Sequence, residues 1–350
     1  MAPLILGLKN EDWVNLRVLI TGQHREMVDE VFKFFGITPD IDLDLMTHNQ
    51  TLNLLTTQIL SEADRILSFE NPDVVLVQGD TTTSMVMALA SFYRKIPVGH
   101  VEAGLRTWDI SNPFPEEANR RIISQIATWH FAPTQVTFNN LVKEGINSKQ
   151  ILLSGNTVID ALKLATNTEL DDDLGILFGE KIVLITCHRR ENFGNPLEDI
   201  FQGLLRLSLN NPDVIFLYPV HPNPNVKDVA ERKLKGIPNL KIIPPLSYTQ
   251  FISIMRRSYL IISDSGGIQE EAPALNIPLL VLRNESERPE ALEIGAVKLV
   301  GTKADDIFST TQMLLDDPKE YLKMINKGSP YGDGHAASKI IKYLAEALRG

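Results

Sequence analysis

Short runs of apolar residues alternate with longer segments of helical period along most of the chain. This alternation is typical of β-strands joined by α-helices, and it predicts parallel sheets. The acidic segment Thr166–Glu180 separates two such halves, and we expect it to be a surface linker. The last predicted helix, Ala336–Leu348, follows a glycine-rich turn. The pattern therefore predicts two α/β halves, each with its own sheet.

In the first half, apolar runs predict strands near Arg17–Ile20, Val74–Gln78, Ile96–Val101, His130–Ala132 and Ile151–Leu153. Helices are predicted between them at Glu26–Phe35, Thr51–Ser68, Thr82–Tyr93, Glu117–Ala127 and Val136–Glu144. In the second half, strands are predicted near Ile182–Thr186, Val214–Tyr218, Lys241–Ile243, Leu260–Ser263, Leu279–Leu282 and Lys298–Val300. Ligands of such sheets bind at the carboxyl ends of the strands, so we expect a ligand in a cleft between the halves.

The composition narrows the class of protein. A chain of 350 residues with 43% hydrophobic and 22% charged residues is globular and long enough for two domains. A formal net charge of -10 argues against a protein that wraps nucleic acid. No apolar run is long enough for a membrane span. The single cysteine, Cys187, excludes an internal disulfide and fits the reducing cytoplasm.

Carboxylates follow two successive strands of the first half. Asp80 follows one strand through a glycine, and Glu102 directly follows the next. Glu116 opens the following helix, with Arg106 and Arg120 nearby in sequence. Acidic residues at helix starts are common, and Asp80 is equally compatible with a helix cap. Three carboxylates brought to one sheet edge would split their pKa values, which supplies acid and base roles.

The second half contains a candidate phosphate site. The turn Ser265-Gly266-Gly267 follows a buried strand and starts a helix, so its backbone N–H groups suit an anion. The same motif is compatible with an ordinary glycine turn. Glu271, in the first helical turn, either complements the helix dipole or accepts hydrogen bonds from ribose hydroxyls.

Other residues of the second half add to this site. A basic cluster that begins at His188 follows a strand and suits a diphosphate, although a solvated loop has the same composition. Phe251 offers a ring to stack on a base, and Arg288 lies at a strand-to-helix junction. Cys187 is predicted to be a small buried side chain rather than a nucleophile.

Taken together, these segments resemble the non-hydrolysing UDP-N-acetylglucosamine 2-epimerases over nearly the whole chain. The matching runs are GQHREM from Gly22, PDVVLVQGDTTT from Pro72, IPVGHVEAGLRT from Ile96, PFPEEANRR from Pro113, SGNTVIDAL from Ser154, HRRENFG from His188, YPVHPNPNV from Tyr218, SDSGGIQEEAP from Ser263, SERPEA from Ser286 and PYGDGHAASKI from Pro330.

The resemblance implies a fold like that of the GT-B glycosyltransferases: two Rossmann-like domains with a cleft between them and the last helix packed on the first domain. We expect a first domain at 1–160 plus 336–350 that carries the catalytic carboxylates, and a UDP-binding domain at 175–335. The implied activity is reversible conversion of UDP-GlcNAc to UDP-ManNAc in the synthesis of surface-polysaccharide precursors. The implied enzyme is a cytoplasmic homodimer without NAD or metal, often activated by its own substrate.

By motif, the resemblance assigns catalysis to Asp80, Glu102, Glu116, Arg120 and His188. It assigns UDP binding to His188, Phe251, Ser265, Gly266, Gly267, Glu271 and Arg288. The implied route eliminates UDP to give 2-acetamidoglucal and then adds it back. Which carboxylate removes the C2 proton and which returns one is left open.

The sequence departs from the family pattern at three places. Leu246 stands where a polar side chain is more usual beside the uracil, and Ser286 replaces a threonine. Family members begin with a strand and a basic glycine-containing turn, whereas Met1–Leu4 matches the helix that follows that turn. We therefore expect upstream coding sequence to supply the strand, and this chain expressed alone to be poorly soluble or nearly inactive.

Three other functions remain open at this point. A hydrolysing 2-epimerase would release free ManNAc and UDP. A nucleotide-sugar-binding protein without turnover would bind the same ligand and is compatible with the short first segment. A glycosyltransferase would share the fold but needs an acceptor site that the sequence does not locate.

Overall fold

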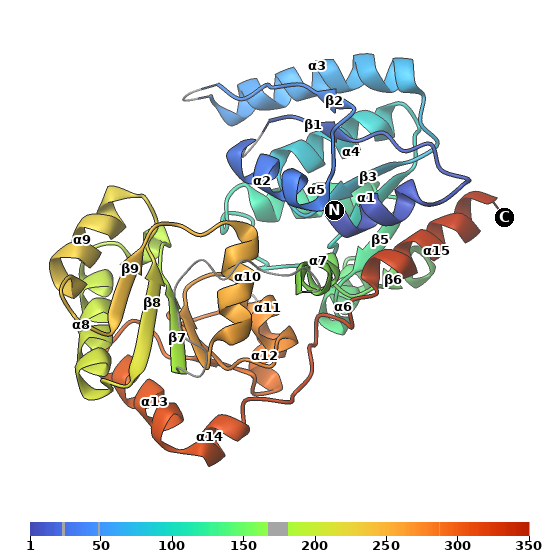
Figure 1. Cartoon of the computed structure of the whole chain (residues 1–350). Coiled ribbons are helices and arrows are strands. Elements are labelled where there is room, and N and C mark those ends of the chain that lie inside the picture. Colours follow the sequence, from blue (N-terminus) through green and yellow to red (C-terminus); the bar gives the residue numbers. More distant parts are fainter. Residues whose placement is uncertain (23–24, 48–49, 167–180, 287, 350) are drawn as a thin grey trace. The chain divides into compact units, whose positions relative to one another are not determined.

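The computed structural model describes residues 1–22, 25–47, 50–166, 181–286 and 288–349. The chain divides into two compact units, drawn in Figure 1. Unit 1 comprises Met1–Lys163 and Tyr331–Gly350, and unit 2 comprises Leu164–Pro330. The linker predicted at Thr166–Glu180 lies outside the described residues from residue 167 onward. None of the described helices is long and apolar enough to cross a membrane.

Unit 1 alternates strands and helices as its apolar pattern predicts. Its strands are β1 (Leu19–Ile20), β2 (Ile41–Asp42), β3 (Val75–Gln78), β4 (Val98–Val101), β5 (Trp129–Ala132) and β6 (Ile151–Leu153). Its helices are α1 (Ala2–Lys9), α2 (Arg25–Phe35), α3 (Leu52–Glu70), α4 (Thr82–Tyr93), α5 (Glu116–Ile126), α6 (Gln135–Lys143), α7 (Thr157–Thr166, which continues into unit 2) and α15 (Ala336–Arg349).

The main sheet of unit 1 is parallel and has the order β3-β4-β5-β6, while β1 and β2 form a separate parallel pair. Because neighbouring strands are consecutive in the chain and parallel, all four carboxyl ends lie at one edge of the sheet. Apolar residues of α3 and α4, such as Ile59 and Val86, pack with Val77 of β3 in a buried cluster. This edge is where the sequence predicts the catalytic carboxylates.

The last helix, α15, belongs to unit 1 and packs against α1, as Figure 1 shows. Leu4 and Leu8 of α1 share a buried cluster with Ile340 and Leu344 of α15. The buried carboxylate of Asp160 caps α15 by accepting the backbone N–H groups that begin the helix. The structure therefore confirms the helix matched at the start of the chain and the packing of the last helix on the first domain.

Unit 2 has a larger parallel sheet in the order β12-β11-β10-β7-β8-β9. Its strands are β7 (Lys181–Thr186), β8 (Val214–Pro219), β9 (Leu240–Ile243), β10 (Leu260–Ser263), β11 (Leu279–Val281) and β12 (Val297–Leu299). Its helices are α8 (Asn195–Asn210), α9 (Pro224–Leu234), α10 (Tyr248–Arg257), α11 (Ile268–Ala274), α12 (Pro289–Glu293), α13 (Ala304–Asp316) and α14 (Pro318–Leu322).

The strand order of unit 2 reverses between β7 and β10. The chain runs outward from β7 through β8 to β9, then returns to place β10 on the other side of β7. In an open parallel sheet, ligands bind at such a switch point, outside the carboxyl ends of the strands. The loops that follow β7 and β10 contain the basic cluster and the glycine turn predicted from the sequence.

The predicted strands are present, with shifted ends that have local causes. β4 begins at Val98 rather than Ile96, because the N–H of Ile96 bonds to Ser91 at the end of α4. The pair β1–β2 is shorter than predicted, and β2 was missed because two residues carry no readable alternation.

Candidate active site

The first two predicted carboxylates lie at neighbouring strand ends of unit 1. Gln78 and Val101 pair across β3 and β4, so Asp80 and Glu102 follow adjacent strands at one edge. The N–H of Gly79 donates to the carbonyl of Val101 at 3.0 Å. The Gln78 amide Nε2 donates to Glu102 Oε2 at 3.3 Å. The two turns are therefore cross-linked by hydrogen bonds.

Glu102 adopts a left-handed backbone with φ of 63°. For a residue with a Cβ this conformation is strained, at a cost of about 1–3 kcal/mol. Such strain persists only where the surrounding structure enforces it, and it is concentrated at functional positions. Glu102, whose side chain is half-buried, is therefore held in this conformation by its surroundings.

Arg120 holds the carboxylate of Asp80 from α5. Its Nε and Nη2 donate to Asp80 Oδ2 at 2.9 and 2.7 Å. The side chain of Asn119 donates to the backbone carbonyl of Asp80 at 2.8 Å. Glu116 precedes these residues by three and four positions, which places all three on one face of α5. The structure thus brings Asp80 and Arg120 into contact and puts Glu116 on the helix face that serves them.

Glu117, which the sequence did not single out, organises the same helix start. Its carboxylate is fully buried and accepts the N–H groups of Thr107 and Trp108 at 3.1 and 3.2 Å. It also pairs with Arg120 at 3.1 Å and with Arg121 at 3.5 Å. Glu116 and Glu117 look alike in sequence, because both lie in the first turn of α5. Their different burial shows that they have different roles.

Arg106 does not approach the predicted carboxylates, which corrects one expectation from the sequence. Its guanidinium is fully buried and bonded to Glu144 at 2.6 and 2.8 Å and to Ser124 at 2.7 Å. These partners occupy it because a buried guanidinium requires a counter-charge and acceptors. Proximity of Arg106 to Glu102 in sequence therefore misled the prediction.

In unit 2, the buried carboxylate of Asp264 ties the loop after β7 to the end of β10. Its Oδ2 accepts the backbone N–H groups of His188 and Arg189, each at 2.9 Å, and Asn192 Nδ2 at 3.0 Å. Its Oδ1 lies 3.5 Å from His188 Nδ1. Asp264 was not among the residues predicted from the sequence, although its place directly after a buried strand was a usable signal. His188 is thereby held at the switch point of the sheet.

The His188 ring stacks on His221, with centroids 5.6 Å apart and planes 15° apart. Burial, helped by His188, lowers the pKa of His221. The stack fixes one face of the His188 ring and leaves the side chain 41% exposed, so a ligand can reach it.

Two guanidinium groups converge on the glycine turn. A Cβ at Gly266 would lie 3.1 Å from Arg288 Nη1 and 3.4 Å from Arg189 Nη2, whereas a Cβ at Gly267 would meet nothing within 4 Å. The N–H of Ser265 donates to Ser263 Oγ at 2.9 Å, which fixes the start of the turn. Arg189 belongs to the predicted basic cluster but was not among the selected binding residues. The arrangement suits an anion with several oxygens.

Two carboxylates lie behind the glycine turn with different environments. Glu270 is buried and accepts Arg288 Nε at 2.5 Å. Burial and the neighbouring Glu270 charge raise the pKa of Glu271 to about 7. Burial and the Glu271 charge in turn raise the pKa of Tyr248. Glu271 is therefore poised to accept hydrogen bonds from a ligand that would favour its ionised form.

The remaining named residues of unit 2 lie on other segments: Ser286 in the loop between β11 and α12, Phe251 on α10 and Cys187 directly after β7. Ser286 donates to Gln269 and accepts the N–H of Arg288, so its hydroxyl does what a threonine hydroxyl would do. Phe251 lies half-buried on α10. Cys187 is buried, which confirms the interpretation as a small buried side chain, and burial raises the pKa of its thiol.

Within the part of the chain that the structure describes, no group of three or more His, Cys, Asp or Glu side chains is placed to hold a metal ion.

Two parallel α/β units, one with carboxylates at its strand ends and one with arginines over a glycine turn, define the class of GT-B-like enzymes. The chain belongs to the UDP-N-acetylglucosamine 2-epimerase family, whose model matches residues 7–345. It is 48% identical to a UDP-N-acetylglucosamine 2-epimerase of Campylobacter jejuni over 98% of this chain and 93% of the relative.

Solved structures agree with this assignment. The UDP-GlcNAc 2-epimerase of Neisseria meningitidis bound to UDP-GlcNAc is 45% identical, with a TM-score of 0.92 over 99% of this chain and 96% of that one. The S. aureus MnaA-UDP co-structure is 41% identical, with a TM-score of 0.90 over 100% of this chain and 93% of that one. The predicted family and fold class are confirmed.

Proposed function

We propose that this protein interconverts UDP-N-acetylglucosamine and UDP-N-acetylmannosamine by inverting C2 of the sugar. The observation that carries this is the cross-linked pair of carboxylate turns in unit 1, with Arg120 on Asp80 and a strained backbone at Glu102. It occurs in a chain that matches the epimerase family over residues 7–345. Cytoplasmic location stays a prediction, supported by the single buried cysteine.

The chemistry requires the C1–O bond to break first, because the C2 proton has no adjacent carbonyl to acidify it. UDP leaves with the bonding electron pair, and positive charge develops at C1. A carboxylate then removes the C2 proton, and the electrons of that C–H bond form the C1=C2 double bond of 2-acetamidoglucal. Return of a proton to the opposite face of C2, with re-addition of UDP at C1, gives the epimer.

Unit 1 supplies the acid–base groups in this scheme. Asp80, Glu102 and Glu116 are the candidates to remove and return the proton, a role worth about 10²–10⁴-fold in rate. Arg120 orients the carboxylate of Asp80 through two hydrogen bonds. Glu117 fixes the position of Arg120 and does not face the chemistry, because it is fully buried.

Unit 2 supplies the nucleotide-binding groups. Arg189 and Arg288 converge on Gly266, and with His188 they stabilise the charge that grows on the departing diphosphate. Ser265 and Gly267 complete the turn that receives the phosphates. Glu271 accepts the ribose hydroxyls, and Phe251 stacks on the uracil. Two solved relatives carry UDP or UDP-GlcNAc, which supports this ligand class.

The decisive experiment is incubation with UDP-GlcNAc in deuterated water, followed by NMR and mass analysis of the products. We expect UDP-ManNAc that carries deuterium at C2, because the proton removed exchanges with solvent before one is returned. UDP-ManNAc without deuterium would contradict proton exchange at C2.

Two other results would each replace the proposed function. Free ManNAc together with UDP would identify a hydrolysing epimerase. Thermal stabilisation by UDP-GlcNAc without any epimer, even at high protein concentration, would identify a nucleotide-sugar-binding protein without turnover.

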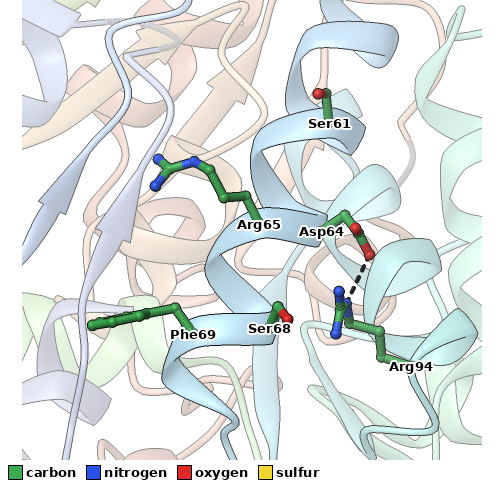
Figure 2. Close-up of a pocket in the computed structure, with 6 residues that line it drawn as sticks. All are labelled: Ser61, Asp64, Arg65, Ser68, Phe69 and Arg94. Carbon is green, nitrogen blue, oxygen red and sulfur yellow. Dashed lines mark hydrogen bonds and ion pairs between the residues drawn. The ribbon is translucent and has the colours of Figure 1, made fainter.

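We also propose that the protein is a homodimer, with unit 1 at the interface. Phe69 at the end of α3 is 85% exposed, and Phe92 and Tyr93 at the end of α4 are 51% and 67% exposed. Figure 2 shows Phe69 beside a shallow surface pocket, with the Asp64–Arg94 ion pair at its other side. Exposed aromatic side chains at the ends of two helices that contact each other favour association with a partner.

Light scattering after size exclusion tests this surface. We expect the wild-type protein to be a dimer and Phe69→Glu to be a monomer, because a charge at the centre of an apolar interface is costly. Leu209→Glu is the matched control, since Leu209 is 67% exposed on α8 of unit 2. A Phe69→Glu variant that stays dimeric would exclude this surface as the interface.

A further inference from the structure

His100, on β4 two residues before Glu102, is completely buried but touches one of the proposed catalytic turns. Its Nε2 lies 2.8 Å from the carbonyl oxygen of Gly79. Its Nδ1 has no hydrogen-bond partner among the described residues. Because a carbonyl oxygen only accepts, the proton of the neutral ring must lie on Nε2.

The His100 ring is neutral at pH 7. Burial lowers the pKa of His100 to about 4, and the nearby Arg106 and Arg120 charges act in the same direction. A completely buried imidazole whose Nε2–H is bonded to a backbone carbonyl has no contact through which to exchange a proton with a ligand. Its contribution is therefore the hydrogen bond that it donates.

That hydrogen bond acts on the turn that presents Asp80. Gly79 has φ of 70°, a left-handed conformation that lets the chain turn sharply after β3. The N–H of Gly79 is bonded to Val101, and its carbonyl is bonded to the ring of His100. Both polar groups of the peptide units around Gly79 are thus fixed by β4, the strand that also presents Glu102.

We infer that His100 is a positioning residue whose Nε2–H locks the Gly79–Asp80 turn against β4, so that Asp80 and Glu102 keep a fixed separation. This rests on the proposed function, in which both carboxylates act on the sugar. A displacement of about 1 Å in such a group costs up to about 10²-fold in rate.

The neighbouring strand offers a matched control. His130 on β5 pairs directly with His100 across the sheet and is equally buried. Burial lowers the pKa of His130 to about 3, so it is neutral as well. Its ring bonds to the backbone of Ala127 and not to a turn that carries a proposed catalytic group. Replacement of His130 therefore measures how much kcat and melting temperature fall when an equally buried histidine is lost that does not contact a proposed catalytic turn.

The experiment compares His100→Leu, His100→Gln, His130→Leu and His130→Gln in the full chain. We measure kcat and KM for UDP-GlcNAc, UDP affinity by calorimetry, and the melting temperature. We expect His100→Leu to lower kcat by about 10–100-fold with UDP affinity within about threefold of wild type. His100→Gln should recover most of kcat, because its amide Nε2 lies as many bonds from the backbone as the imidazole Nε2.

Both His130 variants should keep kcat within about threefold while losing a similar amount of melting temperature. The inference is overturned if His100→Leu keeps wild-type kcat, or if kcat falls equally in His100→Leu and His130→Leu. The inference is also overturned if the kcat of His100→Gln is no higher than that of His100→Leu. Asp80→Asn and Glu102→Gln, measured alongside, separate the two ideas, since wild-type rates in those variants would reject the proposed roles of the carboxylates instead.

Nitrogen NMR of wild-type protein with labelled histidines reports the tautomer and charge of the His100 ring directly. This measurement does not depend on whether His100→Leu folds. We expect the His100 signal, assigned by its loss in His100→Gln, to show a neutral ring protonated at Nε2 at pH 7. A ring protonated at Nδ1, or a charged ring, would remove the proposed donor and overturn the inference.

Discussion

At the scale of single residues, three carboxylates of unit 1 have different surroundings but one proposed task. We predict that Asp80→Asn, Glu102→Gln and Glu116→Gln each lower kcat by at least about 10²-fold and leave UDP affinity nearly unchanged, because they remove a proton acceptor and not a nucleotide contact. Steady-state kinetics and calorimetry give both quantities. A wild-type kcat in one variant would remove that residue from the mechanism.

Glu117→Gln is the matched control for Glu116→Gln, one position away on α5. Because Glu117 is fully buried and accepts two backbone N–H groups, its replacement should lower the melting temperature as well as kcat. Glu116→Gln should leave the melting temperature close to that of wild type.

The glycine turn of unit 2 gives a second prediction at this scale. A Cβ at Gly266 would crowd two guanidinium groups, so Gly266→Ala should displace them and weaken UDP binding by about 1–3 kcal/mol. Arg288→Ala should cause a loss of the same size. Gly267→Ala meets no protein atom, so any loss of affinity there reports contact with the ligand itself. Unchanged UDP affinity in Gly266→Ala and Arg288→Ala would show that the diphosphate lies elsewhere.

Glu271 gives a pH-dependent prediction. Its pKa in the folded protein is about 7, above the ordinary 4.5, so the folded state binds more protons than the unfolded state between these values. Stability contributed by this group therefore falls as the pH rises from about 4.5 to about 7. Glu271→Gln should raise the melting temperature at pH 8 and have no effect near pH 4.5. An effect of the same size at both pH values would contradict the raised pKa.

At the scale of elements, α15 depends on one residue of α7. The Asp160 carboxylate accepts the N–H groups of Ala336 and Ala337 at 3.1 and 2.9 Å. We predict that Asp160→Ala lowers the free energy of unfolding by about 1–3 kcal/mol and speeds hydrogen exchange in α15. Asp333→Ala is the control, because the exposed Asp333 accepts the N–H of His335 at 3.2 Å and pairs with Lys339 on the surface, where such contacts contribute less than at the buried Asp160. Equal effects of the two variants would contradict a special role for Asp160.

The elements themselves were largely predictable from the sequence, and their contacts were not. Apolar runs such as those of β7 and β10 predict buried parallel strands because both faces are covered. The order of the strands, which creates the switch point between β7 and β10, depends on long-range packing that local periodicity does not contain.

The same limit applies to the candidate site. Asp80 and Arg120 were named from their places near predicted element ends, and the structure joins them. Glu117, Asp264 and His100 were missed, because burial decides their part and a single sequence does not show which polar residues are buried. Arg106 was misplaced for the same reason, since its partner Glu144 lies on a different segment of the chain.

At the scale of the whole molecule, the two buried histidines of unit 1 and Glu271 of unit 2 should respond oppositely to acid. In unit 1, His100 and His130 have pKa values of about 4 and about 3, below the ordinary 6.5. In the unfolded chain both histidines take up protons near pH 6.5, whereas in the folded protein they do so only near pH 4 and pH 3. Their contribution to the stability of the folded state is therefore fully present above pH 6.5 and is lost as the pH falls through 4. In unit 2, the contribution of Glu271 to stability rises as the pH falls from about 7 to about 4.5.

We therefore predict that acidification from pH 7 to pH 5 weakens unit 1 relative to unit 2. Hydrogen exchange resolved by segment measures both units in one sample. In the double variant His100→Gln, His130→Gln, the protection of unit 1 should no longer fall between pH 7 and pH 5, because glutamine does not titrate. Equal loss of protection in both units of the wild-type protein would contradict the prediction.

The packing of α15 on α1 also determines which unit can be completed first during synthesis. A ribosome finishes all of unit 2 before it reaches residues 331–350, so the first 163 residues emerge long before the helix that completes their core. During that interval Leu4 and Leu8 lack the side chains of Ile340 and Leu344 that bury them. Unit 2 is continuous in sequence and can fold while unit 1 waits. Newly synthesised chains should thus expose the apolar face of α1 until the last twenty residues have been added.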